Sequence, residues 1–438
     1  MQDVAPKNTL NKKFFIKTFG CQMNKNDSFL MCKILTEHGF KMVDDPAYAD
    51  IFIVNTCTVR DHAANRALAY TSGLKNWRKE GDRILAVVGC LAKSNADDIT
   101  RKLNHVDLIL GPDSYRVIGN YIAQIKEKKV RIIDTRLSGE TYYGIYHSPT
   151  TVVDFVSIMR GCNNYCSYCI VPFVRGQARS RPFADICSEI ANLVKHGVKD
   201  ITLLGQNVNE YNHDNLDFAG LLERIARIPG AFRIRFLTSH PKDFSKETVQ
   251  VIKNHHNICE WFHLPLQSGN DRVLQLMNRK YTREHYRTLV EYIRQEIPNA
   301  TVTTDLIVGF PTETEEEFLE TISMVEEIRF DYAYMYRYSR RTGTKASNIQ
   351  SLDENTIKRR LSELIPIQNE ITKEKTSEMI GREYEVLFES AARGKASRGK
   401  TRGNKDVIVQ TQIKPGEVRN VVIKEVKGHT PIGELVDA

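Results

Sequence analysis

Short apolar runs alternate with segments of helical periodicity along the first third of the chain. The runs at 14–19, 50–55, 83–89 and 106–111 have the length and composition of buried strands. Between them, residues 27–40 and 67–81 have the apolar spacing of amphipathic helices. Strands that alternate with helices predict βαβ units and a parallel sheet. A basic stretch at 126–150 leads to the next part of the chain.

A second series of strands and helices begins near Val152. Its predicted strands are VDFVSIM, DITLLG, RIRFLTS, WFHLPL, TVTTDLIV and DYAYMYRYS, and most of them are separated by helical segments. Six repeats in about 200 residues predict an incomplete (βα) barrel, since eight repeats typically need about 250 residues. A doubly wound sheet is the competing interpretation.

The last part of the chain has a different pattern. Residues 355–378 predict a charged helix without clear caps, and YEVLF, DVIVQTQ and EVRNVVIKEV alternate in polarity as short strands do. These strands predict a small antiparallel β-barrel. The fold class is therefore α/β, with an N-terminal parallel-sheet domain at 12–128, a central partial (βα)6 barrel at 148–378 and the β-barrel at 379–438.

Composition narrows the class of protein. Of 438 residues, 41% are hydrophobic, which excludes wholesale disorder. No run approaches the ~18 apolar residues of a membrane-spanning helix, and the first residues lack the apolar core of a secretory signal. We therefore expect a cytoplasmic protein without a membrane partner. A net charge of +8 is compatible with nucleic-acid binding without indicating it.

The nine cysteines are the residues that most clearly indicate chemistry. Because the chain has no recognisable export signal, we expect them to be free thiols or metal ligands and not disulfides. The most specific motif is CxxxCxxC, at Cys162, Cys166 and Cys169, directly after the first strand of the second series. Thiolates suit iron–sulfur clusters, and three of them leave one iron of a cubane open to a small chelator. A zinc loop is the alternative, but structural zinc takes four ligands.

A second set of cysteines is spread along the first part of the chain. Cys21, Cys57 and Cys90 each follow a predicted strand, in IKTFGC, FIVNTC and AVVGC. The carboxyl ends of parallel strands share one edge of a sheet, so these thiols can converge on a second cluster with an open iron. Three buried structural thiols are the alternative. Cys32, Cys187 and Cys259 are expected to be small core residues.

Polar residues also stand at the carboxyl ends of the predicted barrel strands, where (βα) barrels place their chemistry. They are Gln206, Asn207, Ser239, Gln267 and Asp305. Any one of them could equally be a turn or cap residue. His240 and His263 are expected to be structural.

The segment CNNYCSYC is similar to the motif of the radical S-adenosylmethionine (SAM) superfamily, with Tyr168 as its aromatic residue. That resemblance implies that the open iron binds SAM and that electron transfer cleaves SAM to a 5′-deoxyadenosyl radical. It also implies that Tyr168, Gln206, Asn207, Ser239, Gln267 and Asp305 are residues of the SAM site.

The whole chain resembles the methylthiotransferase family of radical SAM enzymes, through KTFGCQMN, NTCTVR, VVGCLA, VPFVRGQARSRP, LLGQNVNEY, HLPLQSGNDRVLQLMNRKYTREHY and TDLIVGFPTETEEEF. LLGQNVN, PLQSGN with MNRKYTR, and MYRYSRRTGTKAS resemble the branch that makes 2-methylthio-N(6)-(dimethylallyl)adenosine in tRNA. Arg341 departs from that pattern, where proline is frequent. The alternatives are the branches acting on threonylcarbamoyl-adenosine in tRNA or on a ribosomal-protein aspartate. A cluster-bearing RNA-binding regulator without turnover is an alternative of another class.

The family resemblance implies two 4Fe-4S clusters and two SAM molecules. One SAM would methylate a sulfide at the Cys21, Cys57 and Cys90 cluster, and the other would generate the radical that removes hydrogen from carbon 2 of the adenine. The implied partners are tRNA, an electron donor such as flavodoxin or ferredoxin, and a sulfur source. We expect a monomer.

The C-terminal barrel resembles the TRAM domain, an RNA-binding module. A predicted loop at 393–405 has six basic residues and no acidic one: Arg393, Lys395, Arg398, Lys400, Arg402 and Lys405. Such a loop is expected to contact phosphates. The alternative is a solvated loop, with the RNA elsewhere, along Arg175, Arg179 and Arg181.

Overall fold

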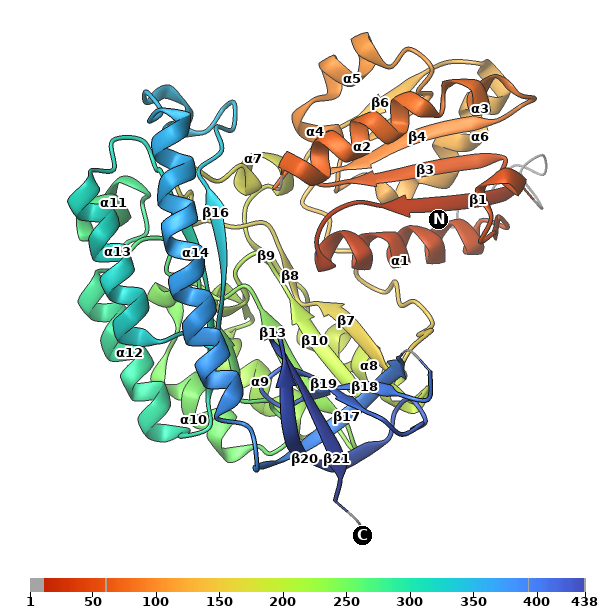
Figure 1. Cartoon of the computed structure of the whole chain (residues 1–438). Coiled ribbons are helices and arrows are strands. Elements are labelled where there is room, and N and C mark those ends of the chain that lie inside the picture. The colour runs from red at the N-terminus through yellow and green to blue at the C-terminus, as the bar shows by residue number, and fades with distance from the viewer. Residues whose placement is uncertain (1–11, 60, 393, 437–438) are drawn as a thin grey trace. The chain divides into compact units, whose positions relative to one another are not determined.

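The computed structural model describes residues 12–59, 61–392 and 394–436, which form two compact units (Figure 1). The first unit takes the described residues of 1–148 together with 157–163 and 169–185. The second takes 149–156, 164–168 and the described residues of 186–438.

The first unit is built on a six-stranded sheet in the order β2-β1-β3-β4-β5-β6. Every neighbouring pair of these strands is parallel, which confirms the predicted parallel sheet. The strands are β1 (Lys13–Thr18), β2 (Lys41–Met42), β3 (Ile51–Thr56), β4 (Ile84–Gly89), β5 (Leu108–Leu110) and β6 (Ile132–Asp134).

Both faces of this sheet are covered, which explains why its central strands are apolar at nearly every position. Successive residues of β3 enter two different cores: Ile51 and Ile53 pack with α1 and α6, whereas Phe52 and Val54 pack with α2, α4 and α5. The helices are α1 (Gln22–Glu37), α2 (Asp61–Gly73), α3 (Lys75–Lys79), α4 (Cys90–Ser94), α5 (Ala96–Lys102) and α6 (Ile118–Lys128). The unit also contains β8 (Met159–Arg160), α7 (Val171–Arg175) and β9 (Arg179–Ser180).

The second unit contains two three-stranded sheets, in the orders β13-β10-β7 and β14-β15-β16. A parallel bridge between Ile234 and Ile258 joins β13 to the chain just before β14. The strands are β7 (Val153–Ser157), β10 (Asp200–Leu204), β13 (Arg233–Leu237), β14 (Trp261–His263), β15 (Thr301–Val308) and β16 (Tyr332–Arg337). Their spatial order follows the chain, as in a (βα) barrel, without the reversal of a doubly wound sheet.

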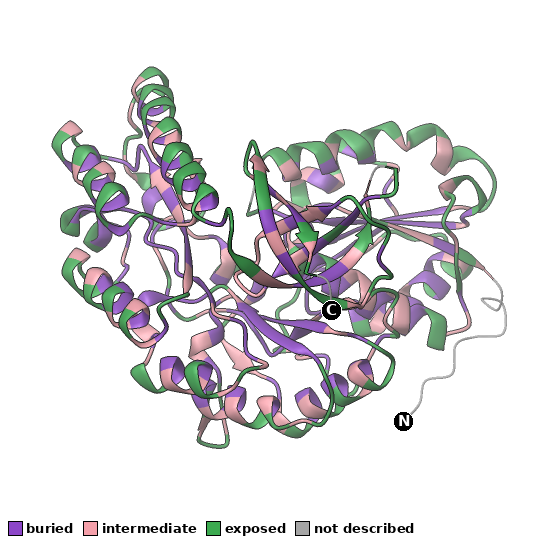
Figure 2. Cartoon of the chain, turned by 60° about the horizontal axis from the view of Figure 1, so that its bottom comes forward, coloured by how far each residue is buried: buried purple, intermediate pink, exposed green. Residues whose placement is uncertain are grey.

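Helices follow most of these strands, as the alternation along the sequence predicts. They are α8 (Phe183–Lys195), α9 (Phe218–Ala226), α10 (Lys246–Asn254), α11 (Asp271–Leu276), α12 (Arg283–Glu296), α13 (Glu315–Ile328) and α14 (Glu354–Ser377). The predicted lack of caps on the last helix is wrong, because Asp353 accepts hydrogen bonds from the backbone N–H groups of Asn355 and Thr356. Figure 2 shows buried residues along the strands and exposed residues on the outer sides of the helices.

The C-terminal part is a closed barrel in the order β17-β18-β19-β21-β20. Its strands are β17 (Glu383–Ala391), β18 (Ser397–Thr401), β19 (Asp406–Val409), β20 (Val418–Lys427) and β21 (Thr430–Leu435). The predicted antiparallel barrel is confirmed except at one seam, since β19 and β21 pair in parallel. Strand β18 also lies inside the predicted basic loop, so that segment is a strand with short flanks. Among the described residues, no helix is long and apolar enough to cross a membrane.

Candidate functional site

Three cysteines of the first unit lie at one edge of its sheet. Cys21 caps the amino end of α1 after β1, Cys57 directly follows β3, and Cys90 is the first residue of α4 after β4. Because β1, β3 and β4 are adjacent and parallel, their carboxyl ends meet there, as the sequence predicts. Cys57 and Cys90 are buried, Cys21 is partly buried, and no disulfide joins any of the nine cysteines.

The glycines before two of these cysteines let the chain approach closely. A Cβ on Gly20 would lie 2.4 Å from Cys57 Cβ, and a Cβ on Gly89 would lie 2.4 Å from the carbonyl oxygen of Thr56. Both glycines have positive φ, +126° and +99°, a region that other residues rarely adopt. Glycine at both positions is therefore required for the thiols to gather.

The three thiols influence one another electrostatically. A hydrogen bond from Cys57, aided by the positive charge of Arg175, lowers the pKa of Cys21 to about 6. The same hydrogen bond raises the pKa of Cys57, and burial raises the pKa of Cys90. Cys21 is thus the thiol that ionises most readily before any ligand binds.

The donor set fits a thiolate-bound cluster. Among the described residues, no group of three or more His, Cys, Asp or Glu side chains is arranged around a single metal ion. A four-iron cluster is larger than one ion and takes soft thiolate ligands, which are the groups collected at this edge. The positive charge of Arg175 favours the ionised, metal-binding form of these thiols, and at Cys90 it opposes the larger effect of burial, which raises the pKa.

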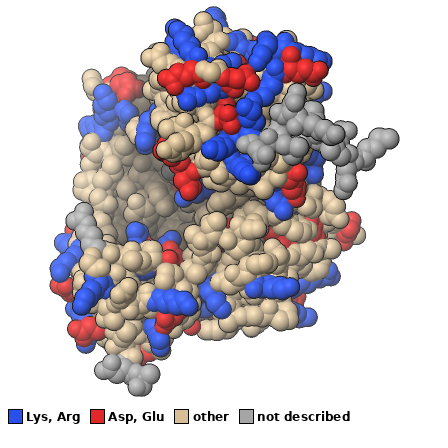
Figure 3. Space-filling model, turned by 90° about the vertical axis from the view of Figure 1, so that its right-hand side faces the viewer, with Lys and Arg blue, Asp and Glu red and all other residues tan. Residues whose placement is uncertain are grey.

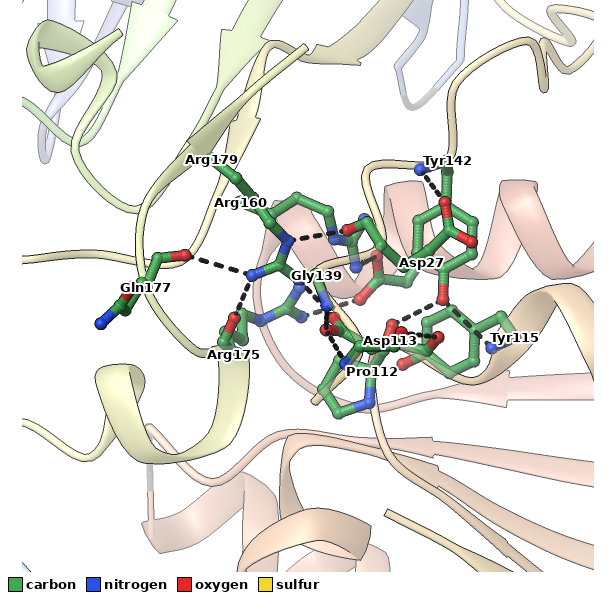
Figure 4. A network of polar contacts seen from close by, with 12 residues as sticks. Asp27, Pro112, Asp113, Tyr115, Gly139, Tyr142, Arg160, Arg175, Gln177 and Arg179 are labelled. Carbon is green, nitrogen blue, oxygen red and sulfur yellow. Dashed lines mark hydrogen bonds and ion pairs between the residues drawn. The ribbon is translucent and has the colours of Figure 1, made fainter. Parts of the chain in front are cut away.

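A buried carboxylate, Asp27, holds two arginines, Arg160 and Arg175 (Figure 4). Asp27 of α1 accepts hydrogen bonds from Arg160 at 2.6 Å and from Arg175 at 2.7 Å. Burial opposes ionisation of Asp27, but the charges of the two arginines lower its pKa below the ordinary value. Arg175 also donates from Nε to the sulfur of Cys90 at 3.2 Å, so the network extends from Asp27 to the cysteine set.

These contacts correct one expectation from the sequence. Arg175, Arg179 and Arg181 are not an RNA-binding surface, because their side chains are only 4%, 15% and 5% exposed. Each of them pairs with a carboxylate inside the unit: Asp27, Asp113 and Asp185, respectively.

The CxxxCxxC segment is shared between the units, with Cys162 and Cys169 in the first and Cys166 in the second. In the second unit, Asn278 donates from Nδ2 to the carbonyl oxygens of Asn164 and Tyr165, both at 3.0 Å. Ser167 donates from its hydroxyl to the carbonyl oxygen of Leu276 at 2.7 Å. The end of α11 and the residues after it therefore fasten the loop that carries Cys166.

One arginine of this unit reaches the cysteine itself. Arg279 donates from Nη1 to the sulfur of Cys166 at 3.5 Å and from Nη2 to the carbonyl oxygen of Pro265 at 2.8 Å. Its side chain is buried, and the first cysteine set has the same kind of neighbour in Arg175.

The predicted SAM-site residues of the second unit differ in their surroundings. Ser239 and Gln267 are 4% and 7% exposed, and Ser239 Oγ and Gln267 Oε1 have no hydrogen-bond partner among the described residues. Unsatisfied buried polar atoms are uncommon, and a polar ligand would satisfy them. Tyr168 packs against the apolar cluster that contains Met277 and Phe310.

Other predicted residues of this site have partners within the unit. Asn207 donates to Asp243 at 2.8 Å and accepts from the backbone N–H of His240 at 3.1 Å, which ties the chain after β10 to that after β13. Asp305 lies on β15 with its carboxylate 3.6 Å from His263 Nε2. Gln206 is half-buried beyond the end of β10.

The two histidines have structural surroundings. His240 accepts the backbone N–H of Lys242 at 3.3 Å, and burial lowers its pKa to about 2, so it stays neutral. His263 shares a hydrogen bond with Thr303 Oγ1 at 3.1 Å.

The basic segment of the C-terminal barrel divides into two groups. Arg402 pairs with Glu260, at 2.6 Å, and Lys405 donates to Thr376 Oγ1 at 2.8 Å, so these two side chains hold the barrel to the rest of the unit. The expectation that they contact phosphate is not supported, because the same atoms are already used. Lys395 is exposed, Lys400 is half-buried, and Arg398 is exposed beside Asp406. Arg393 lies outside the described residues.

Charge on the surface is mixed. The face drawn in Figure 3 has Lys and Arg side chains spread over it, with Asp and Glu among them. This fits the modest net charge of +8. Nucleic-acid binding would therefore depend on a local group of basic residues and not on the charge of the whole surface.

Comparisons with known proteins identify the family. The radical SAM superfamily matches residues 156–325, and a family described as uncharacterized protein family UPF0004 matches residues 13–111. A tRNA-2-methylthio-N(6)-dimethylallyladenosine synthase of Thermodesulfovibrio yellowstonii is 42% identical over 424 residues, 96% of this chain and 98% of that protein. The chain belongs to this synthase family. A synthase of the same name from Bacteroides fragilis is 41% identical over 443 residues, 97% of this chain and 96% of that protein.

Solved structures support the fold alone. A radical S-adenosylmethionine methyltransferase, TsrM, from Kitasatospora setae has a TM-score of 0.58 at 11% identity, covering 77% of each chain. Its structure was determined with cobalamin and a 4Fe-4S cluster bound. This chain thus shares its fold with a protein of very different sequence.

Sequence reasoning missed four residues that contact or support the cysteines: Asp27, Arg175, Asn278 and Arg279. All four lie in or beside motifs that carry the family resemblance. No local signal identified these partners, since Arg175 and Arg279 contact sulfurs 85 and 113 residues away in the sequence.

Proposed function

We propose that this chain is a radical SAM methylthiotransferase that inserts a methylthio group at carbon 2 of N(6)-dimethylallyladenosine beside the anticodon in tRNA. The observation that carries the proposal is the gathering of Cys21, Cys57 and Cys90 at the ends of adjacent parallel strands, in a chain that also contains CxxxCxxC. Two sets of three thiols provide two cluster sites, each with one open iron. The relatives described above are named for this activity, and the match to this chain covers 98% and 96% of their lengths.

In this proposal three parts of the chain have separate tasks. Residues 12–128 hold an auxiliary cluster through Cys21, Cys57 and Cys90, and residues 148–378 form the radical SAM core with Cys162, Cys166 and Cys169 as ligands. Residues 379–438 form a TRAM domain that binds RNA. When bound, the two 4Fe-4S clusters and SAM supply an organic radical and a methylated sulfur, which side chains alone cannot provide.

The side chains of the chain bind and orient the reactants. Ser239 Oγ and Gln267 Oε1 are buried polar atoms that a polar ligand such as SAM would satisfy. Asn207 joins the loop after β10 to the loop after β13, so we assign it the role of fixing the positions of these two loops. Tyr168, Gln206 and Asp305 complete the proposed SAM site.

The same proposal names the partners. tRNA is the substrate, and Lys395, Arg398 and Lys400 are the barrel residues we assign to its phosphates. Reductive cleavage of SAM needs an electron, so we infer a donor such as flavodoxin or ferredoxin, and the inserted sulfur needs a source. We infer a monomer, and the cytoplasmic location stays a prediction.

The experiment is an anaerobic reaction of the reconstituted protein with SAM, a reductant and tRNA that carries N(6)-dimethylallyladenosine. Mass spectrometry of the digested tRNA should detect the 2-methylthio nucleoside, together with 5′-deoxyadenosine. tRNA with threonylcarbamoyl-adenosine is the matched control and should stay unchanged. Modification of that control alone would assign the chain to the other tRNA branch, and tRNA binding without 5′-deoxyadenosine would indicate a regulator.

A further inference from the structure

Helix α7 connects the two cysteine sets along the chain. It begins two residues after Cys169 and ends at Arg175. Cys90 of the other set packs in a small buried cluster with Ile170 and Val174, which belong to this segment. A segment that directly follows one cysteine motif therefore forms part of the wall around the other.

Arg175 provides the polar contact of this wall. Its guanidinium donates from Nε to Cys90 Sγ at 3.2 Å and from Nη2 to Asp27 Oδ2 at 2.7 Å. The side chain is 4% exposed, and Arg175 Nη1 has no hydrogen-bond partner among the described residues. A buried guanidinium with an unused donor beside three thiols is expected to meet an acceptor that binds at those thiols.

We propose that Arg175 is a positioning residue of the Cys21, Cys57 and Cys90 site, which holds the Cys90 sulfur in place and raises the reduction potential of the group bound there. Asp27 fixes the guanidinium in this orientation. The proposal rests on the part of the proposed function that assigns a cluster to these cysteines and is independent of the tRNA substrate.

The physical basis is the effect of outer contacts on a metal site. Hydrogen bonds to ligating sulfurs and nearby positive charge stabilise the more electron-rich state of an iron–sulfur cluster. Low exposure strengthens the effect, since little water screens the charge. Removal of the guanidinium should therefore make the cluster harder to reduce.

Arg160 offers a matched control. It pairs with the same carboxylate, donating to Asp27 Oδ1 at 2.6 Å, and it is also buried. Its guanidinium lies 4.7 Å from the ring centre of Tyr142 (Figure 4). Arg175, in contrast, donates to the Cys90 sulfur. Substituting either arginine removes one ion pair of Asp27, but only the Arg175 substitution removes the hydrogen bond to the Cys90 sulfur.

The test uses the full chain with Cys162→Ala, Cys166→Ala and Cys169→Ala, so that one cluster site remains. In this parent we would introduce Arg175→Gln, Arg175→Lys or Arg160→Gln, reconstitute each protein anaerobically, and measure its iron content, electron paramagnetic resonance spectrum and midpoint potential. Arg175→Gln should shift the potential to more negative values and alter the spectrum. Arg175→Lys keeps the positive charge but loses the planar guanidinium with its several N–H donors, so it should shift the potential less than Arg175→Gln does. Arg160→Gln should stay close to the parent.

Two results would overturn the proposal: a parent-like potential in Arg175→Gln, or an equal shift in Arg160→Gln. If Arg175→Gln holds no iron, the midpoint potentials of Arg175→Lys and Arg160→Gln are compared instead. A more negative potential in Arg175→Lys alone supports the proposal, and equal potentials in the two variants overturn it. If the parent itself holds no iron, the cluster assignment of the proposed function fails and this inference fails with it.

Discussion

Arg279 donates to the sulfur of Cys166 at 3.5 Å across 113 residues of sequence. Arg175 has the same relationship to Cys90 at 3.2 Å across 85 residues. Each cysteine set thus has a buried guanidinium on one of its sulfurs, and in both cases the two residues are far apart in the sequence. Hydrogen bonds of this kind orient the sulfurs of a metal site and tune the group that they bind.

The carboxylate between Arg160 and Arg175 should be important for stability. Asp27→Ala would leave two buried guanidiniums without a carboxylate partner, and such a change typically costs about 3–5 kcal/mol. We expect the apparent free energy of unfolding of the iron-free protein, measured with urea, to fall by that order.

The control lies on the same helix. Glu37 pairs with Lys33 at 3.2 Å on the surface, with its side chain 56% exposed. Glu37→Ala should change the free energy of unfolding by about 1 kcal/mol or less. Equal effects of the two substitutions would contradict the role assigned to Asp27.

Iron content should report two independent sites. The reconstituted chain should bind about eight irons, and the variant with Cys162→Ala, Cys166→Ala and Cys169→Ala should keep about four. Iron and sulfide assays on anaerobic samples measure this directly. A variant without iron would mean that the Cys21, Cys57 and Cys90 set is not a site of its own.

The exposed residues of the C-terminal barrel should determine the salt dependence of tRNA binding. Replacing Lys395, Arg398 and Lys400 by Ala should weaken binding and lower the salt slope by about 0.7–0.9 for each phosphate that the variant no longer neutralises. Affinity across a salt series measures the slope.

Arg402→Ala is the matched control, because it removes one positive charge from the same segment. Its guanidinium is occupied by Glu260, so this variant should lower thermal stability and keep the salt slope. If Arg402→Ala flattened the slope as much as the triple variant, the division of the segment into two groups would be wrong.

His240 should make stability depend on pH. Burial lowers its pKa from 6.5 to about 2 in the folded chain, so only the unfolded chain takes up this proton as the pH falls below 6.5. The contribution is present above pH 6.5 and is lost as the pH falls toward 2; at pH 5 the loss is about 2 kcal/mol.

The measurement is urea unfolding of the iron-free protein at several pH values. His240→Gln should show a smaller loss of stability between pH 7 and pH 5 than the unsubstituted chain, whereas His196→Gln, at an exposed position, should lose as much. An unchanged pH dependence in His240→Gln would refute the assignment.

The fold could be predicted largely from the sequence, because apolar runs of strand length alternate with helical periodicity in both units. The carboxyl-edge placement of Cys21, Cys57 and Cys90 followed from the parallel sheet alone. Strand β18 was missed because its glycine and basic residues have low strand propensity, and closure of the barrel overrides it.

The side-chain partners could not be predicted, since they depend on tertiary contacts. Arg175 and Arg402 look alike in the sequence as members of basic segments, but one meets Asp27 and the other meets Glu260. Their partners lie 148 and 142 residues away, a separation that no local pattern encodes.

The central claim is that the two cysteine sets perform different half-reactions. The most direct measurement follows 5′-deoxyadenosine and the 2-methylthio nucleoside of tRNA in parallel, for Cys57→Ala and for Cys166→Ala. Cys57→Ala should keep SAM cleavage and lose sulfur insertion, whereas Cys166→Ala should lose both. A Cys57→Ala variant that makes the methylthio product at the unsubstituted rate would contradict the account.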